Sequence, residues 1–166
     1  MDAALFAETL RFGMAGLALY AFAEKFLPFI PSFAFLMFVG MTAGGQPADV
    51  GLSFLAVTMG SMLGTVALFS LGRYINEQRI RSFAARFGGY LFLSVEGFDR
   101  LVAAYRRRQF RVTLIAQFIP VARNYTALSA GTVGIAFVPF FLATIPGTFL
   151  WNTLFLTLGY VWRITG

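Results

Sequence analysis

The sequence has no cysteine and no histidine among its 166 residues. Thiol chemistry and disulfides are therefore excluded, and the usual zinc and copper ligands are missing. A mechanism that needs an imidazole base is excluded as well. Charge is also scarce, because only 12% of the residues are Asp, Glu, Lys or Arg, against about 25% in soluble domains. The chain is thus short of the residues that cover a water-exposed surface.

Apolar residues take their place. The chain is 58% hydrophobic and 17% aromatic, with a mean hydropathy of +0.75. This composition predicts an all-α, multi-pass integral membrane protein. The start, "MDAALFAETLRFG", has no basic region ahead of a short apolar run. We therefore expect it to be part of the mature protein and not a signal peptide.

The basic residues are concentrated in residues 73–111. This segment holds nine of the thirteen basic residues and three of the seven acidic ones, and so carries the whole net charge of +6. A basic loop between apolar segments is typical of the cytoplasmic side, and it gives no reason to expect a nucleic-acid partner. Within it, apolar residues recur every three or four positions from Val95 to Tyr105. This spacing predicts an amphipathic helix on the inner membrane surface.

Three segments are predicted to span the membrane as helices. Residues 50–72 and 137–162 carry no charge and exceed the roughly 20 residues that a spanning helix needs. Residues 4–23 are the third candidate. Gly60 and Gly64 form a G-x-x-x-G pair, which lets helices approach closely. That approach can be internal or can join two copies in a homo-oligomer.

Two further apolar segments contain helix breakers. Residues 26–43 include Pro28 and Pro31, and residues 112–135 include Pro120. Proline removes a backbone donor and disrupts the preceding turn. Broken backbone at membrane depth is tolerated only where protein buries it or a wet cavity lies beside it. We therefore predict two re-entrant segments within one membrane domain covering residues 1–166.

The distribution of basic residues indicates from which side of the membrane each re-entrant segment enters. With residues 73–111 inside, the first re-entrant segment enters from the outer side and the second from the inner side. Two opposed re-entrant hairpins, about three spanning helices and a cytoplasmic amphipathic helix then form an inverted repeat. Many secondary transporters have this plan and bind their substrate near the bilayer midplane.

Ionisable residues next to the breaks are the candidate site. Such residues are costly in a membrane and usually functional. Arg123 follows Pro120 by three residues, and its guanidinium can bind phosphate in a bidentate manner. Gln117 and Asn124 add polar groups nearby, and Glu24 precedes the first break. The alternatives are structural: Arg123 can pair with Glu24 or cap carbonyls that Pro120 frees, and Glu24 can pair with Lys25.

Four stretches resemble the DedA family of bacterial membrane proteins, also called the VTT or SNARE-associated domain. They are "EKFLPFIPS" (24–32), "GSMLGTVALFSLGR" (60–73), "FIPVARNYTALSAG" (118–131) and "WNTLFLTLGY" (151–160). The resemblance implies opposed re-entrant hairpins in the inner (cytoplasmic) membrane and transport of phospholipid-like molecules, including undecaprenyl phosphate. It also implies proton coupling through two acids and two arginines.

Carried over by position, the first acid falls on Glu24 and the second arginine on Arg123. The second acid falls on Phe33 and the first arginine on Gln117, so half of the charged quartet is absent. This departure leaves proton coupling open.

The resulting prediction is a lipid transporter that recycles undecaprenyl phosphate or a similar anionic lipid phosphate. Arg123, with Gln117 and Asn124, would bind the phosphate, and Glu24 would act as the gating or proton-coupling group. The alternative is an uncoupled phospholipid scramblase or a membrane-homeostasis protein. Neither reading needs a cofactor. A lipid-phosphate enzyme is disfavoured because histidine is absent and the three aspartates are far apart in sequence.

Overall fold

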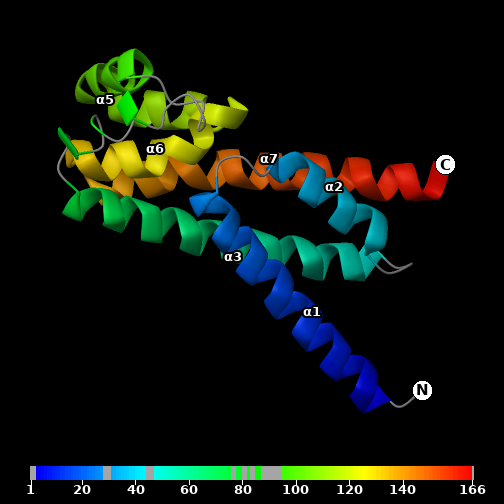
Figure 1. Cartoon of the computed structure of the whole chain (residues 1–166). Coiled ribbons are helices and arrows are strands. Elements are labelled where there is room, and N and C mark those ends of the chain that lie inside the picture. Colours follow the sequence, from blue (N-terminus) through cyan, green and yellow to red (C-terminus); the bar gives the residue numbers. More distant parts are fainter. Residues whose placement is uncertain are drawn as a thin grey trace. The chain divides into compact units, whose positions relative to one another are not determined.

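The computed structural model describes residues 3–27, 31–43, 47–75, 78–79, 82, 85–86 and 95–165. Helices make up its named elements (Figure 1): α1 (Ala3–Ala23), the 3₁₀ turn η1 (Glu24–Phe26), α2 (Ser32–Thr42), α3 (Pro47–Tyr74), α5 (Val95–Ala116), α6 (Pro120–Val133) and α7 (Phe137–Thr165).

Two of these helices are long and apolar enough to cross a membrane. They are Ala48–Tyr74 within α3 and Phe137–Thr165, which is α7. The prediction of an all-helical chain with long apolar helices is thus confirmed for the described residues. The third candidate span, residues 4–23, lies in α1, which is 21 residues long. That α1 crosses the membrane stays a prediction.

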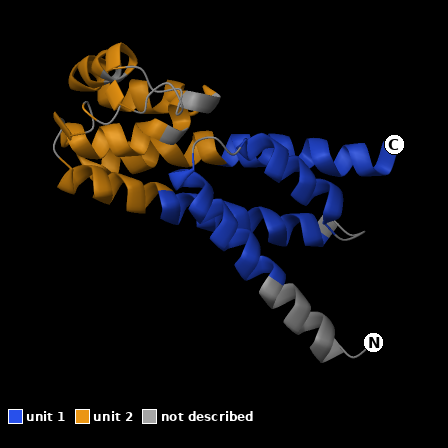
Figure 2. Cartoon of the chain, viewed as in Figure 1, with its two compact units in different colours: residues 1–64, 149–166 blue, residues 65–148 orange. Residues whose placement is uncertain are grey.

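The helices divide between two compact units (Figure 2). Unit 1 consists of residues 1–64 and 149–166, and unit 2 of residues 65–148. Helices α3 and α7 each contribute one part to each unit, because the divisions fall inside them.

Unit 1 packs α2 against α7 at two glycines that face each other's backbones. A Cβ atom on Gly40 would lie 2.2 Å from the carbonyl oxygen of Leu156, and one on Gly159 would lie 2.1 Å from that of Met37. Each helix therefore needs a glycine for the other to fit. A small apolar core surrounds the contact and includes Ala21, Leu36, Val39, Val57 and Leu156.

The G-x-x-x-G pair of α3 serves packing inside unit 1. A Cβ on Gly60 would lie 2.0 Å from the carbonyl oxygen of Ala18 in α1. One on Gly64 would lie 2.8 Å from the carbonyl oxygen of Phe22 and 2.8 Å from Cγ of Lys25. The predicted close helix approach is confirmed, and it is internal.

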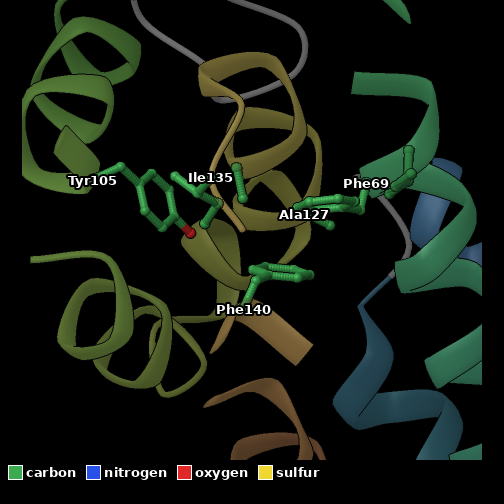
Figure 3. Close-up of a cluster of buried hydrophobic side chains, with 7 residues drawn as sticks. Phe69, Tyr105, Ala127, Ile135 and Phe140 are labelled. Carbon is green, nitrogen blue, oxygen red and sulfur yellow. The ribbon is translucent and has the colours of Figure 1, made fainter. Parts of the chain in front are cut away.

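In unit 2, helices α3 and α6 also pack closely through facing glycines. A Cβ on Gly72 would lie 2.3 Å from the carbonyl oxygen of Leu128, and one on Gly131 would lie 2.1 Å from that of Phe69. The neighbouring core contains Leu68, Phe69, Tyr105, Ala127, Ala130, Ile135 and Phe140, and Figure 3 shows side chains from several helices converging there.

The amphipathic helix α5 belongs to this core. Val102 and Tyr105 are buried, and Val102 packs with Tyr125 and Leu128 of α6. Protein therefore covers the apolar face at Val102 and Tyr105, whereas its placement on the inner membrane surface stays a prediction. Burial raises the pKa of Tyr105 to about 12, so its hydroxyl stays protonated and donates to the carbonyl of Thr126 at 3.3 Å. Helical geometry is interrupted at Arg108, with φ −147° and ψ 63°.

In both units an arginine near the end of a long helix, α3 or α7, hydrogen-bonds the chain just after the shorter helix that packs on it, α6 or α2. Arg73 Nη2 donates to the carbonyl of Ile135 at 2.9 Å in unit 2, and Arg163 Nη1 donates to the carbonyl of Ala43 in unit 1.

Helix α6 is capped by Gly134 (φ 76°), and the amide of Ile135 bonds the carbonyl of Ala130 at 3.2 Å. This is a Schellman ending, in which glycine takes the left-handed position at little cost.

Replacing Gly72 by alanine should destabilise unit 2, because the added Cβ meets backbone that cannot move aside. We expect a loss of about 1–3 kcal/mol in unfolding free energy, as for other overpacked contacts. Thermal unfolding in detergent measures it. Gly51→Ala is the matched control on the same helix, since nothing lies within 4 Å of that Cβ. It should be neutral or stabilising by up to about 1 kcal/mol, and equal loss in both variants would contradict the packing.

Candidate functional site

The break in unit 1 begins where α1 tightens into η1. The amide of Leu27 bonds the carbonyl of Glu24 at 3.1 Å. Leu27 then turns to φ −118° and ψ 82°, because the residue before a proline is driven out of the helical region. The next residue, Pro28, lies outside the described residues. Helix α2 starts at Ser32 with Pro31 in the N-cap position.

Two oppositely charged side chains are buried at this break. Glu24 is 3% exposed and Lys25 is 6% exposed. The Lys25 ammonium nitrogen lies 3.8 Å from Glu24 Oε1. The lysine stem passes over α3 at Gly64, where its Cγ would be 2.8 Å from a Cβ. The sequence suggested Lys25 only as a partner for Glu24, and its burial was missed.

The break in unit 2 lies between α5 and α6. The amides of Phe118 and Ile119 bond carbonyls three residues back at 3.1 and 3.2 Å, which tightens the end of α5. Ile119 is then extended, at φ −103° and ψ 112°, and α6 begins with Pro120. A proline in the first helical position costs little, because its missing N–H would have no helical partner there. Proline thus ends one helix and starts the next.

Gln117 and Arg123 are buried on either side of this break. Gln117 is 3% exposed and Arg123 is 5% exposed. The stem of Gln117 packs on α7, since a Cβ on Gly147 would lie 2.3 Å from its Cβ. Arg123 is anchored by its backbone: its amide bonds the carbonyl of Ile119 at 2.9 Å, and its carbonyl accepts from Thr126 Oγ1 at 2.8 Å.

The electrostatics of this turn favour an anion. Arg123 is the fourth residue of α6, so its positive charge sits in the first turn of the helix. The positive end of the helix dipole acts in the same direction as the guanidinium. A phosphate or carboxylate placed there would be stabilised by both.

The remaining site predictions concern Asn124, the pairing of Glu24 with Arg123, and the position of Phe33. Asn124 is on α6, but its side chain lies outside the described residues. Glu24 belongs to unit 1 and Arg123 to unit 2, so their pairing stays a prediction. Phe33 is 42% exposed and lies against Phe155, with ring centroids 5.9 Å apart. An aromatic contact therefore occupies the position where the resemblance implied an acid.

Hydroxyl side chains and the amide of Asn152 are buried as well, and the burial of the hydroxyls as a group was missed. They are Ser32, Ser53, Ser61 and Asn152 in unit 1, and Thr65, Thr113, Thr126, Ser129, Thr144 and Thr148 in unit 2. Asn152 Nδ2 donates to Thr58 Oγ1 at 3.0 Å and so links α7 to α3. Thr113 and Thr144 donate to carbonyls of their own helices. The four-residue spacing of Thr144, Thr148 and Asn152 was the available signal.

Taken together, these features define a helical membrane protein whose units each bury charged or amide side chains at a helix break. The VTT domain family matches residues 30–161. The chain belongs to this family, as the DedA resemblance predicted.

Several curated proteins are similar over most of the chain. An "Alkaline phosphatase-like protein" of Lactococcus lactis subsp. cremoris (strain MG1363) is 30% identical over 151 residues, which is 90% of this chain and 70% of that protein. "Undecaprenyl phosphate transporter A" of Staphylococcus aureus is 28% identical over 149 residues, 90% of this chain and 73% of that protein. "Protein DedA" of Escherichia coli (strain K12) is 24% identical over 135 residues, 80% and 59% respectively. No solved structure matches significantly.

Removing one charge of the buried pair Glu24–Lys25 should lower the unfolding free energy more than removing both charges. Glu24→Gln leaves a buried ammonium without its carboxylate neighbour, and Lys25→Gln does the reverse. Each should lower the unfolding free energy by about 3–5 kcal/mol, whereas the double variant should recover most of it. Thermal unfolding in detergent distinguishes the three. Additive losses in the double variant would contradict a coupled pair.

Proposed function

We propose that this chain transports phosphate-bearing lipids across the cytoplasmic membrane and recycles undecaprenyl phosphate or a close analogue. The observation that carries the proposal is the buried Arg123 in the first turn of α6, next to the break at Pro120. Membership in the VTT family and the similarity to proteins named undecaprenyl phosphate transporter A support it.

The proposed architecture is an inverted repeat with two re-entrant segments. Its support is that the same contacts recur in both units. A second helix follows each break, packs on a long helix through facing glycines, and is held at its end by an arginine. We infer that the two halves run in opposite directions in the membrane, with the basic segment 73–111 on the cytoplasmic side.

In the proposed mechanism, the protein replaces the water around the phosphate while the prenyl tail stays in lipid. The guanidinium of Arg123 binds two phosphate oxygens, and the amides of the α6 N-terminus add partial positive charge. The Gln117 amide donates a further hydrogen bond to the phosphate, and Asn124 is proposed as another phosphate-binding residue. A charged headgroup can then enter apolar surroundings without the full cost of dehydration.

Glu24 is proposed as the gating group, since a buried carboxylate repels an approaching phosphate until it is neutralised or moved. An uncoupled scramblase is the second candidate. The observation that favours it is the neutral residue at both Phe33 and Gln117, which leaves fewer groups to carry protons. A dependence of transport on the proton gradient separates the two.

An enzymatic function is disfavoured despite the name of the Lactococcus relatives. Metal-dependent phosphoryl hydrolysis uses ions held by carboxylates and imidazoles. The chain has no histidine, and the described residues contain no group of three or more His, Cys, Asp or Glu that could hold a metal ion. The buried groups at the breaks suit binding better than bond cleavage.

Arg123→Gln should lower undecaprenyl phosphate translocation in proteoliposomes at least tenfold, because the charged partner of the phosphate is lost. Tenfold corresponds to about 1.4 kcal/mol, less than one charge-assisted hydrogen bond contributes. Arg107→Gln is the matched control, since Arg107 is exposed on α5, and it should transport at the wild-type rate. Unchanged transport by Arg123→Gln would show that the guanidinium does not bind the headgroup.

A further inference from the structure

Lys25 is the only lysine in the chain, whose other twelve basic residues are all arginine. It is also buried, at 6% exposed. Lysine is normally the most solvated of side chains and is almost never fully buried without a partner. Within the described part of the chain, the buried charged side chains are Glu24, Lys25 and Arg123. All three lie within four residues of a break.

The packing shows which positions of the two breaks correspond. Lys25 is followed by Phe-Leu-Pro, and Gln117 by Phe-Ile-Pro. The stem of Lys25 packs on Gly64 of α3, and the stem of Gln117 packs on Gly147 of α7. The residue before each first proline lies outside helical geometry in both units. Residues 26–28 are therefore the equivalent of Phe118-Ile119-Pro120, although Phe29-Ile30-Pro31 has the identical sequence.

This correspondence assigns a side chain to each break. Lys25 stands before the break in unit 1, where unit 2 has the neutral Gln117. Arg123 stands after the break in unit 2, at the position where unit 1 has Pro31. Each unit thus buries one cation beside its break.

Stability alone does not account for the pair at the first break. Burying an ion pair brings little net stabilisation, because desolvation offsets the attraction. The separation of 3.8 Å is also longer than the roughly 2.7–2.9 Å of a tight charge-assisted hydrogen bond. A headgroup phosphate can take the place of this contact between the Lys25 ammonium and Glu24 Oε1.

We propose that Lys25 is a second phosphate-binding residue, which takes the lipid headgroup in exchange for Glu24. This inference rests on the proposed function and extends it. The chain then has one phosphate-binding cation per unit, Lys25 and Arg123. The ligand class is a phosphate monoester on an apolar tail. An ammonium is a compact charge without the fixed fork of a guanidinium, so Lys25 selects charge more than shape.

The test measures binding of labelled undecaprenyl phosphate to the detergent-solubilised protein, with undecaprenol as the neutral lipid. Lys25→Gln should weaken binding of the phosphate lipid at least tenfold and leave undecaprenol unchanged. Glu24→Gln should tighten phosphate binding, because the competing carboxylate is gone. Glu24→Gln/Lys25→Gln should bind it at least tenfold more weakly than Glu24→Gln, and Lys25→Arg should stay within about threefold of the wild type.

The double variant keeps the test valid if Lys25→Gln alone fails to fold, because it removes both charges together. Equal phosphate binding by the double variant and Glu24→Gln would assign Lys25 a purely structural role and overturn the inference. A wild-type protein that binds the two lipids equally would overturn the proposed function as well. Selective wild-type binding without any effect of Lys25 would overturn the inference alone.

The single lysine allows a second measurement on the unmutated protein. An amine-reactive acylating reagent can modify only Lys25 and the chain's amino terminus, and peptide mass spectrometry separates the two. Undecaprenyl phosphate should slow acylation of Lys25 at least threefold, whereas undecaprenol should not. Excess inorganic phosphate that gives the same protection would identify the phosphate group as the ligand, without need of the tail. Acylation at the same rate in all samples would contradict the inference.

Discussion

The fold depends on glycines that allow helix backbones to touch. A helix broken inside apolar surroundings leaves carbonyl and amide groups that must be enclosed by protein. The helix after each break is short, 11 residues for α2 and 14 for α6. Both are held on a long helix by facing glycines, with separations that no other residue permits. The breaks can persist because these contacts fix the helices that follow them.

The breaks in turn place the charged groups. Leu27 and Ile119, which each precede a proline, lie outside helical geometry, and the chain around each break packs against a long helix. Glu24, Lys25, Gln117 and Arg123 are buried beside these breaks, although three of them are charged. The aliphatic stem of Lys25 packs on Gly64 and that of Gln117 packs on Gly147. The ammonium and amide groups at the ends of these stems remain for polar interactions. Arg123 is positioned by the first turn of α6. A membrane protein thus obtains buried cations without placing them in the middle of a regular apolar helix.

The sequence predicted the helical class, the long apolar helices, the close helix approach at Gly60 and the DedA family. It did so because apolar length and G-x-x-x-G spacing depend on local sequence alone. It did not predict that α5 would cover α6, because an amphipathic face does not reveal whether lipid or protein covers it. It missed the complete burial of Lys25, since burial there depends on Gly64 of a distant helix.

The most direct measurement of the central claim compares two lipids that differ only in the phosphate. Wild-type protein is reconstituted in liposomes, and translocation of undecaprenyl phosphate and of undecaprenol is followed against protein-free liposomes. The account predicts acceleration of undecaprenyl phosphate alone, because the buried cations at the breaks act on the phosphate. Equal acceleration of both lipids, or of neither, would contradict it.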